Sequence, residues 1–422
     1  MRTLLSCLLL PLLALPAVAH DLIPATAQSR DLLLRHATLY TVSQGILEDT
    51  DLLLHDGRIA AIGKQLAAEG AEEIDASGKR IYPGLIALDS HAGMVEIEMA
   101  RPTRDIADVG LNNAELRAAS AFNPDSEIIP TLRRNGISHV QLVPEGEAMA
   151  GQSALVGLDS WTVEQALVPS RMGQHLYWPE LGPLASDDEE RSKQLKEHDE
   201  ATRQIRTLFA DAKRYALGIK AGDKIAQQRN LAAMAPLFDD AATLFIHVDR
   251  EQHIEEALKL CREYQLKPVI VGGYDAWRQA ASLNELGARV IYASVFSLPK
   301  RSDEPVDMAF RIPALLSDAG VPFAIGYSGD WDSRNLAFAA GYAAAHGLGQ
   351  DKALRAITLD AARMLGVDDM GALEVGYRGN IIVAEGDILD PMSGRIEALF
   401  IDGRRVDLNN RQQQLYQKYL KK

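Results

Sequence analysis

One apolar segment that ends in two polar side chains constrains the fold of this chain more than any other stretch. Residues 81–88 are almost uniformly apolar, and Asp89 and His91 follow them directly. A continuous apolar run of this length is typical of a strand that is buried on both faces of a parallel sheet. Because side chains alternate along a strand, Asp89 and His91 are expected on the same face at its end. Polar groups in that position predict the functional rim of an α/β barrel.

The region after this segment alternates apolar runs with helical patterns, which predicts a parallel α/β domain. The charged segment 186–200 is expected to form a solvated helix face or a loop insertion. The expected strands are 81–88, 138–143, 243–248, 268–271, 290–293 and 322–326, and the expected helices include 202–215, 251–264, 275–286, 310–319 and 333–346.

Strand-rich segments flank this region at both ends. Residues 31–62 contain short apolar strands and a hairpin signal at Asp56-Gly57, and apolar strands return after residue 365. The economical interpretation of the 422 residues is a TIM-like (β/α)8 barrel with a small composite β-sandwich built from both chain ends. The predicted boundaries are 83–365 for the barrel, 31–82 and 366–407 for the sandwich, and 408–422 for a polar C-terminal tail.

The first residues and the net charge bear on location and partners. A positive start, an apolar run over 4–15 and Ala17-Val18-Ala19 predict a signal peptide over 1–19, and hence a periplasmic or secreted protein without a membrane span. A lipoprotein site at Cys7 is the alternative, but it leaves almost no hydrophobic region. Cleavage leaves Cys261 as the sole cysteine, so no intramolecular disulfide is expected. The net charge of −14 argues against nucleic acid and anionic membranes as partners.

Segments at both ends of the expected barrel resemble the amidohydrolase superfamily, in particular its imidazolonepropionase-like members. Residues 79–86 resemble the family's entry into its first barrel strand, residues 351–366 the helix after its last strand, and residues 371–383 and 401–406 its return to the sandwich. The resemblance covers about 31–407. It implies hydrolysis of C–N bonds in small amides or cyclic amides, in which one or two divalent metals lower the pKa of a water and an aspartate acts as base. It is also compatible with a homodimer.

The family's metal ligands are only partly present in this sequence. The first-strand Asp-x-His-x-His falls on residues 87–91, so His91 is kept and Asp89 replaces the first histidine. A carboxylate can still bind zinc or a similar metal. His247 matches the histidine of the fifth strand, whereas residues 290–294, taken as the sixth strand, contain none.

The eighth strand and the neighbouring loops supply the remaining candidates. Ser328 occupies the place of the family's aspartate, and Asp330, two residues further on, is the candidate catalytic base; the alternative is a loop aspartate that caps a helix. Tyr327 and Ser328 are candidate substrate contacts. Arg101 and Arg104 follow the first strand and could bind an anionic group, although ion pairs that fix the loop would explain them equally well.

These observations leave three hypotheses open. The first is an exported hydrolase with at most one divalent metal, bound by Asp89, His91 and His247. The second is an inactive amidohydrolase-like binding or scaffold protein, because the sixth-strand histidine and the eighth-strand aspartate are missing. The third is metal-free hydrolysis with Ser328 or Tyr327 near His247. Lys220 is the nearest candidate for a fourth-strand lysine ligand, and a solvated lysine is the expected alternative.

Overall fold

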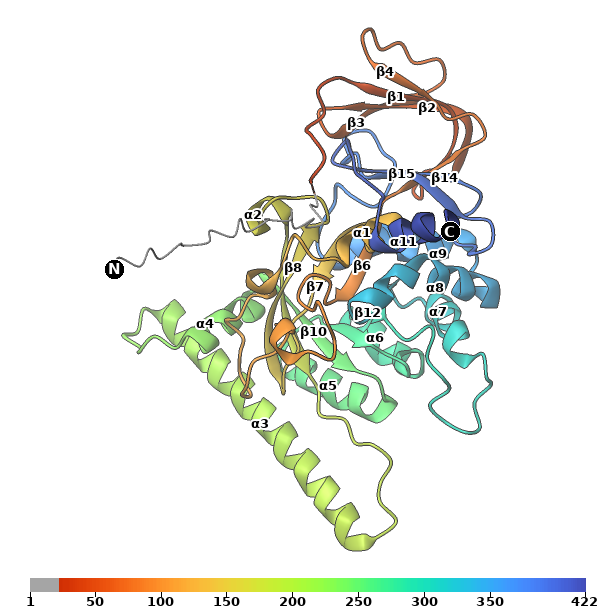
Figure 1. The fold of residues 1–422 in the computed structure, drawn as a ribbon. Helices are drawn as coiled ribbons and strands as arrows, with labels where there is room; N and C mark the ends of the chain where they lie inside the picture. The colour runs from red at the N-terminus through yellow and green to blue at the C-terminus, as the bar shows by residue number, and fades with distance from the viewer. Residues whose placement is uncertain (1–22) are drawn as a thin grey trace, which may run out of the picture.

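The computed structural model describes residues 23–422 as two eight-stranded sheets with surrounding helices (Figure 1). The predicted signal peptide, residues 1–19, and Cys7 lie outside the described residues. Among those that are described, no helix is both long enough and apolar enough to cross a membrane.

The first sheet combines strands from both ends of the chain. Its order is β16-β15-β14-β5-β1-β2-β3, with β4 paired to β1. In Figure 1 the red strands of the N-terminal part and the blue strands of the C-terminal part form one body above the barrel. The strands are β1 Leu32–Tyr40, β2 Ile46–His55, β3 Arg58–Gly63, β4 Glu72–Asp75, β5 Arg80–Pro83, β14 Ile381–Glu385, β15 Arg395–Ile401 and β16 Arg404–Arg405.

The second sheet is a nearly closed barrel with the order β13-β12-β11-β10-β9-β8-β7-β6. All neighbours are parallel except β8, which runs antiparallel to β7 and β9. A bridge between Ser90 and Gly329 links the two end strands at the rim. The predicted TIM-like fold is therefore confirmed, with one reversed strand. The strands are β6 Leu85–Ser90, β7 Ile137–Leu142, β8 Met149–Gly157, β9 Leu167–Tyr177, β10 Ala242–Val248, β11 Val269–Gly272, β12 Arg289–Tyr292 and β13 Phe323–Ile325.

The helices cover the outside of the barrel and connect its strands. The predicted helix over 202–215 is only the second half of α3, because the charged segment before it is also helical. Asp187 caps α3 by accepting hydrogen bonds from the backbone N–H groups of Glu189 and Glu190 at 3.1 and 3.0 Å. The helices are α1 Ile129–Arg134, α2 Val163–Ala166, α3 Asp188–Ala221, α4 Arg229–Met234, α5 Glu251–Tyr264, α6 Ala280–Leu286, α7 Met308–Asp318, α8 Leu336–Ala343, α9 Gln350–Ala356, α10 Leu359–Met364 and α11 Arg411–Leu420.

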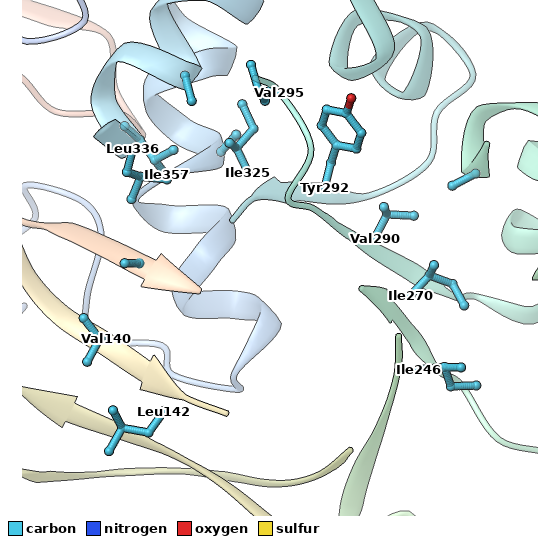
Figure 2. Packing of buried hydrophobic residues seen from close by; sticks show 14 of the residues in the cluster. Val140, Leu142, Ile246, Ile270, Val290, Tyr292, Val295, Ile325, Leu336 and Ile357 are labelled. Atoms are coloured by element: carbon cyan, nitrogen blue, oxygen red, sulfur yellow. The ribbon is translucent and has the colours of Figure 1, made fainter. Parts of the chain in front are cut away.

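Side chains of the barrel strands divide between two hydrophobic cores. Ile246, Ile270 and Val290, on three neighbouring strands, belong to the layer between strands and helices (Figure 2). Phe245 belongs to the cluster that fills the barrel interior. Because strand side chains alternate, His247 has the same orientation as Phe245 and faces the interior at the end of β10.

The apolar segment that was expected to form one strand is divided between the two sheets at Gly84. β5 pairs with β1 and β14 in the first sheet, whereas β6 opens the barrel. A Cβ atom on Gly84 would lie 2.5 Å from Oγ and 2.8 Å from Cβ of Ser138. Glycine is therefore required where the chain crosses from one sheet to the other.

Gly84→Ala is expected to lower the free energy of unfolding by about 1–3 kcal/mol, because the added methyl group overpacks the contact with Ser138. Urea denaturation measures this change. Gly182→Ala is the matched control, since a Cβ there meets nothing within 4 Å. Ser138→Gly in the same chain should recover part of the loss, and equal losses in the single and double variants would contradict the steric explanation.

His139 on β7 is a buried imidazole with incomplete hydrogen bonding. Its Nδ1 lies 2.9 Å from Ser138 Oγ, and within the described part of the chain its Nε2 has no partner. Burial lowers the pKa of His139 to about 4. The neutral ring is therefore the form that the fold accommodates.

The stability of the protein is expected to fall on acidification through His139. The unfolded imidazole takes up a proton near pH 6.5, whereas the folded one stays neutral down to about pH 4, so the unfolded chain binds more protons between these values. The free energy of unfolding should fall in this window by about 1.4 kcal/mol per pH unit on account of this residue. Urea denaturation at several pH values should give a shallower slope for His139→Leu, and an unchanged slope would contradict the assignment.

Candidate active site

Four titratable side chains gather at the carboxyl ends of three barrel strands. Asp89 ends β6 and His91 follows it, while His247 lies on β10 and His175 on β9. Asp89 Oδ1 lies 3.9 Å from His247 Nδ1, and His247 Nε2 lies 2.9 Å from His175 Nδ1. The structure therefore brings Asp89 and His247 together, as the sequence predicted, and it adds His175, which was not a predicted site residue.

Asp89 does not sit in regular strand geometry. Its φ is +62°, and the pairing of β6 with β7 shifts register between Ala87 and Ser90. The pairing of β6 with β7 is thus irregular at Asp89, although Asp89 and His91 both belong to the group around His247. Aspartate tolerates this left-handed conformation better than most residues do. The distortion leaves the Asp89 carboxylate buried beside His247, with 7% of its side chain exposed.

The His247 ring contacts the rings of Tyr177 and His175 inside the barrel. Its ring stacks on Tyr177 with 4.0 Å between ring centroids, and His175 stacks on Phe245 at 4.7 Å. These contacts follow from the register of β9 and β10, which pairs Tyr177 with His247 and His175 with Phe245. The two histidines therefore occupy successive layers, with His175 the deeper one.

Burial favours the neutral form of both histidines. Desolvation, together with the neighbouring His247 and His91, lowers the pKa of His175 well below its usual value. Burial also lowers the pKa of His247, although Asp89 partly offsets the effect. Neutral imidazoles are the form in which histidine binds a metal.

His91 lies at the edge of this group. Its Nε2 is 3.6 Å from Glu145 Oε1, and its backbone N–H donates to Gly329 O at 2.9 Å. His91 contributes to the lowered pKa of both His175 and His247. His91 is thus positioned by the junction of the first and last strands, facing an acidic neighbour that was not a predicted site residue.

The eighth strand supplies a hydroxyl where the family has a carboxylate. Ser328 Oγ donates a hydrogen bond to Asp89 Oδ2, so the serine orients the carboxylate that replaced the family's histidine. Asp330 is half-buried at the start of the short helix 331–335, and its Oδ2 has no partner within residues 23–422. No side-chain cap hydrogen bond comes from Asp330. Its role as a base stays a prediction.

The strand that was predicted to be the sixth of the barrel is the seventh. Residues 290–292 lie in β12, which is the seventh strand in the sheet order from β6, and the sixth strand is β11. β11 ends at Gly272, where a Cβ would lie 2.7 Å from Asp249 Oδ1. The sixth strand thus also lacks a histidine. Lys220 lies near the end of α3 as an exposed residue paired with Asp239 at 3.0 Å, so it is not a barrel ligand.

The loop after β6 carries the two candidate arginines. Arg101 and Arg104 are exposed, and within the described range 23–422 neither guanidinium has an ion-pair partner. The loop-fixing ion pairs that were the alternative are therefore not formed. Tyr327 contacts Phe296 with 6.2 Å between ring centroids, which is a packing contact. A pocket of about 510 Å³ lies beside this loop, lined by Met94, Asp105, Glu115, Arg117, Pro144 and others.

Comparisons with known proteins show which families this chain is similar to. The model of the amidohydrolase family matches residues 246–406. A dihydroorotase of Bacillus cytotoxicus is 48% identical over 52 residues, which cover 12% of each chain. A D-hydantoinase of Geobacillus stearothermophilus is 40% identical over 62 residues, which cover 15% of this chain and 13% of that protein. The chain thus matches only 12% and 13% of the length of these curated relatives.

A solved structure extends the similarity to nearly the whole chain. The crystal structure of an amidohydrolase from Thermotoga maritima MSB8 has a TM-score of 0.78 and 21% sequence identity, and the match covers 89% of this chain and 99% of that one. At this identity the likeness concerns the fold. The similarity to the amidohydrolase family therefore consists of a family model over residues 246–406 and of a fold shared with a solved amidohydrolase.

Proposed function

We propose that this protein is an exported hydrolase of C–N bonds in small cyclic amides, working with at most one divalent metal at the barrel mouth. Hydrolase chemistry follows from the family. Cyclic amides are suggested by the local matches to a dihydroorotase and a D-hydantoinase. Export rests on the sequence of residues 1–19.

The observation that carries the metal proposal is the 3.9 Å gap between Asp89 Oδ1 and His247 Nδ1. This distance is too long for a hydrogen bond, and it leaves Asp89 and His247 as two side chains that would hold a cation between them. His247 can donate its Nε2–H to His175 Nδ1, which leaves the Nδ1 lone pair facing Asp89. A histidine oriented in this way by a second polar group is typical of metal sites.

The barrel mouth offers too few ligand side chains for more than one metal ion. Asp89, His247 and His91 would hold the cation. Within residues 23–422, however, their ligand atoms do not all lie within 4.8 Å of one another. Side-chain movement is therefore needed to complete the site, so weak binding of a single ion is expected. When bound, such a cation polarises the amide carbonyl and lowers the pKa of a water.

The remaining roles fall to residues of the rim. Asp330, with an unpartnered carboxylate oxygen, would accept the proton from the attacking water. Ser328 would hold Asp89, and Arg101 or Arg104 would bind an anionic group of the substrate.

The test is hydrolysis of a panel that includes dihydroorotate and hydantoins, by protein reconstituted with Zn²⁺ or Mn²⁺. The proposal expects ring opening that a chelator abolishes and that Asp330→Asn lowers by about 10²–10⁴-fold. Absence of turnover on the whole panel with either metal would reject the hydrolase and favour the alternative, an inactive binding or scaffold protein. The replacement of the family's aspartate by Ser328 is the observation that favours this alternative. It expects a ligand to raise the melting temperature without any metal dependence.

A further inference from the structure

We propose that His198, His253 and Glu256 form a second metal site, outside the barrel, that binds Zn²⁺ or a similar divalent ion and fixes α3 against α5. Within residues 23–422 they make up the one group of three or more histidine, cysteine, aspartate or glutamate residues whose ligand atoms all lie within 4.8 Å of one another. The proposal does not depend on the function of the barrel mouth.

The three side chains come from two helices that are distant in sequence. His253 and Glu256 are three residues apart near the start of α5, so they project from the same face of that helix. His198 reaches them from the first third of α3, and its Nε2 lies 3.1 Å from Glu256 Oε2. The rings of His198 and His253 are 5.1 Å apart between centroids. Two imidazoles and one carboxylate are a common ligand set for zinc with an open fourth position.

Hydrogen bonding identifies the ring nitrogen of His253 that is available. The backbone N–H of Leu181 approaches Nε2 of His253 at 3.4 Å, so Nε2 carries the lone pair and Nδ1 the proton. Nδ1 in turn faces Glu180 Oε1 at 3.7 Å. A carboxylate behind a histidine is the arrangement that orients metal-binding imidazoles. An ion bound at Nε2 would replace the long contact with the Leu181 N–H.

A simple ion pair accounts for only part of this cluster. His198 and Glu256 would satisfy one another, but Nδ1 of His198 and Nδ1 of His253 are both buried without a hydrogen bond within residues 23–422. Two adjacent and largely buried imidazoles are costly unless something compensates their polar atoms. A bound cation would engage one nitrogen of each ring and offset the negative charge of Glu256.

A surface pocket leads to the site, and Trp178 connects the site to the barrel mouth. A pocket of about 750 Å³ reaches His253 from the surface and is lined by Leu181, Leu195, Arg250, Gln279, Arg301 and others. The Trp178 side chain donates to Glu256 Oε2 at 3.4 Å, and its backbone N–H donates to His247 O at 3.1 Å. The site therefore holds the segment between β9 and α3 in place beside the barrel mouth.

The decisive experiment is Zn²⁺ titration of chelator-treated full-length protein that carries His247→Ala, so that the barrel mouth contributes no metal. The proposal expects one zinc per chain by calorimetry and elemental analysis, and a rise in melting temperature with zinc. His198→Gln and Glu256→Gln should each abolish both effects, and Glu180→Gln should weaken binding by about 10–100-fold. His55→Gln, at an exposed site in the first sheet, is the matched control and should bind normally.

Two results would overturn the proposal. Zinc binding that is unchanged in His198→Gln or Glu256→Gln would place the ion elsewhere, and no binding in the His247→Ala background would show that this cluster takes none. Glu256→Gln keeps the shape of the side chain, so it is the informative variant if His198→Gln fails to fold. Loss of activity in His247→Ala alone, with this zinc retained, would separate the two sites.

Discussion

Replacing His247 by alanine is expected to abolish metal binding at the barrel mouth and to lower kcat/KM for cyclic amide hydrolysis by at least about 100-fold. His247 is the side chain that links the mouth together, because its Nδ1 faces Asp89 at 3.9 Å and its Nε2 faces His175 at 2.9 Å. Even the loss of an outer-shell partner of a metal ligand costs about 10–100-fold in affinity or activity, so the loss of a ligand should cost at least as much. Steady-state kinetics and metal analysis of the purified variant measure both effects.

His55→Ala serves as the control for this variant. His55 is exposed on β2 and contacts Asp31, far from the barrel strands in the sheet order. It should leave activity and metal content unchanged. Full activity in His247→Ala would mean that the reaction takes place without the cluster described here, and it would reject both the metal-dependent mechanism and the metal-free mechanism that uses His247.

Asp159→Ala is expected to lower the free energy of unfolding by about 3–5 kcal/mol, the largest effect on stability predicted for a single polar residue of this protein. The Asp159 carboxylate follows β8 and contacts Arg133 of α1 and Arg404 of β16, both at 3.0 Å. The side chain of Asp159 is 0% exposed and that of Arg133 is 4% exposed. Its removal would leave the Arg133 guanidinium buried without its counter-charge, at the junction between barrel and first sheet.

Urea denaturation checks this expectation against two further variants. Asp211→Ala removes an exposed partner of Arg214 and should change stability by no more than about 1 kcal/mol. Arg133→Met combined with Asp159→Ala should be more stable than Asp159→Ala alone, because the unpaired charge is then gone. A double variant that is as unstable as the sum of both single changes would show that the ion pair itself supplies little of the stability.

The fold could be predicted where hydrophobic periodicity is strong. The runs 243–248 and 268–271 became β10 and β11 with small shifts in their ends. β8 and β9 were missed, because β8 contains Gly151, Gln152 and Ser153 and pairs in the antiparallel sense, so it lacks the continuous apolar run of a buried parallel strand. The charged start of α3 could be predicted either as a helix or as a loop. Few of its side chains contact the core, so it shows no clear helical pattern of apolar residues.

Only part of the candidate site could be predicted from the sequence, because one of its residues lies on a strand that was not predicted. Asp89, His91 and His247 stand next to recognisable strand ends, whereas His175 lies on the missed strand β9. His175 and Tyr177 are two residues apart on β9, so their side chains point to the same face, and Tyr177 pairs with His247. This spacing could have indicated that His175 faces the barrel interior. The left-handed backbone of Asp89 has no signal in the residue pattern, because it depends on the packing of β6 against β7 and β13.

The most direct test of the account is an anomalous diffraction map at the zinc absorption edge, from crystals of the protein grown with Zn²⁺. We expect an anomalous peak at the barrel mouth between Asp89 and His247. It should be separate from any peak at His198, His253 and Glu256. A mouth without a peak at saturating zinc, with Asp89 and His247 hydrogen-bonded directly to each other, would contradict the proposed metal-dependent active site.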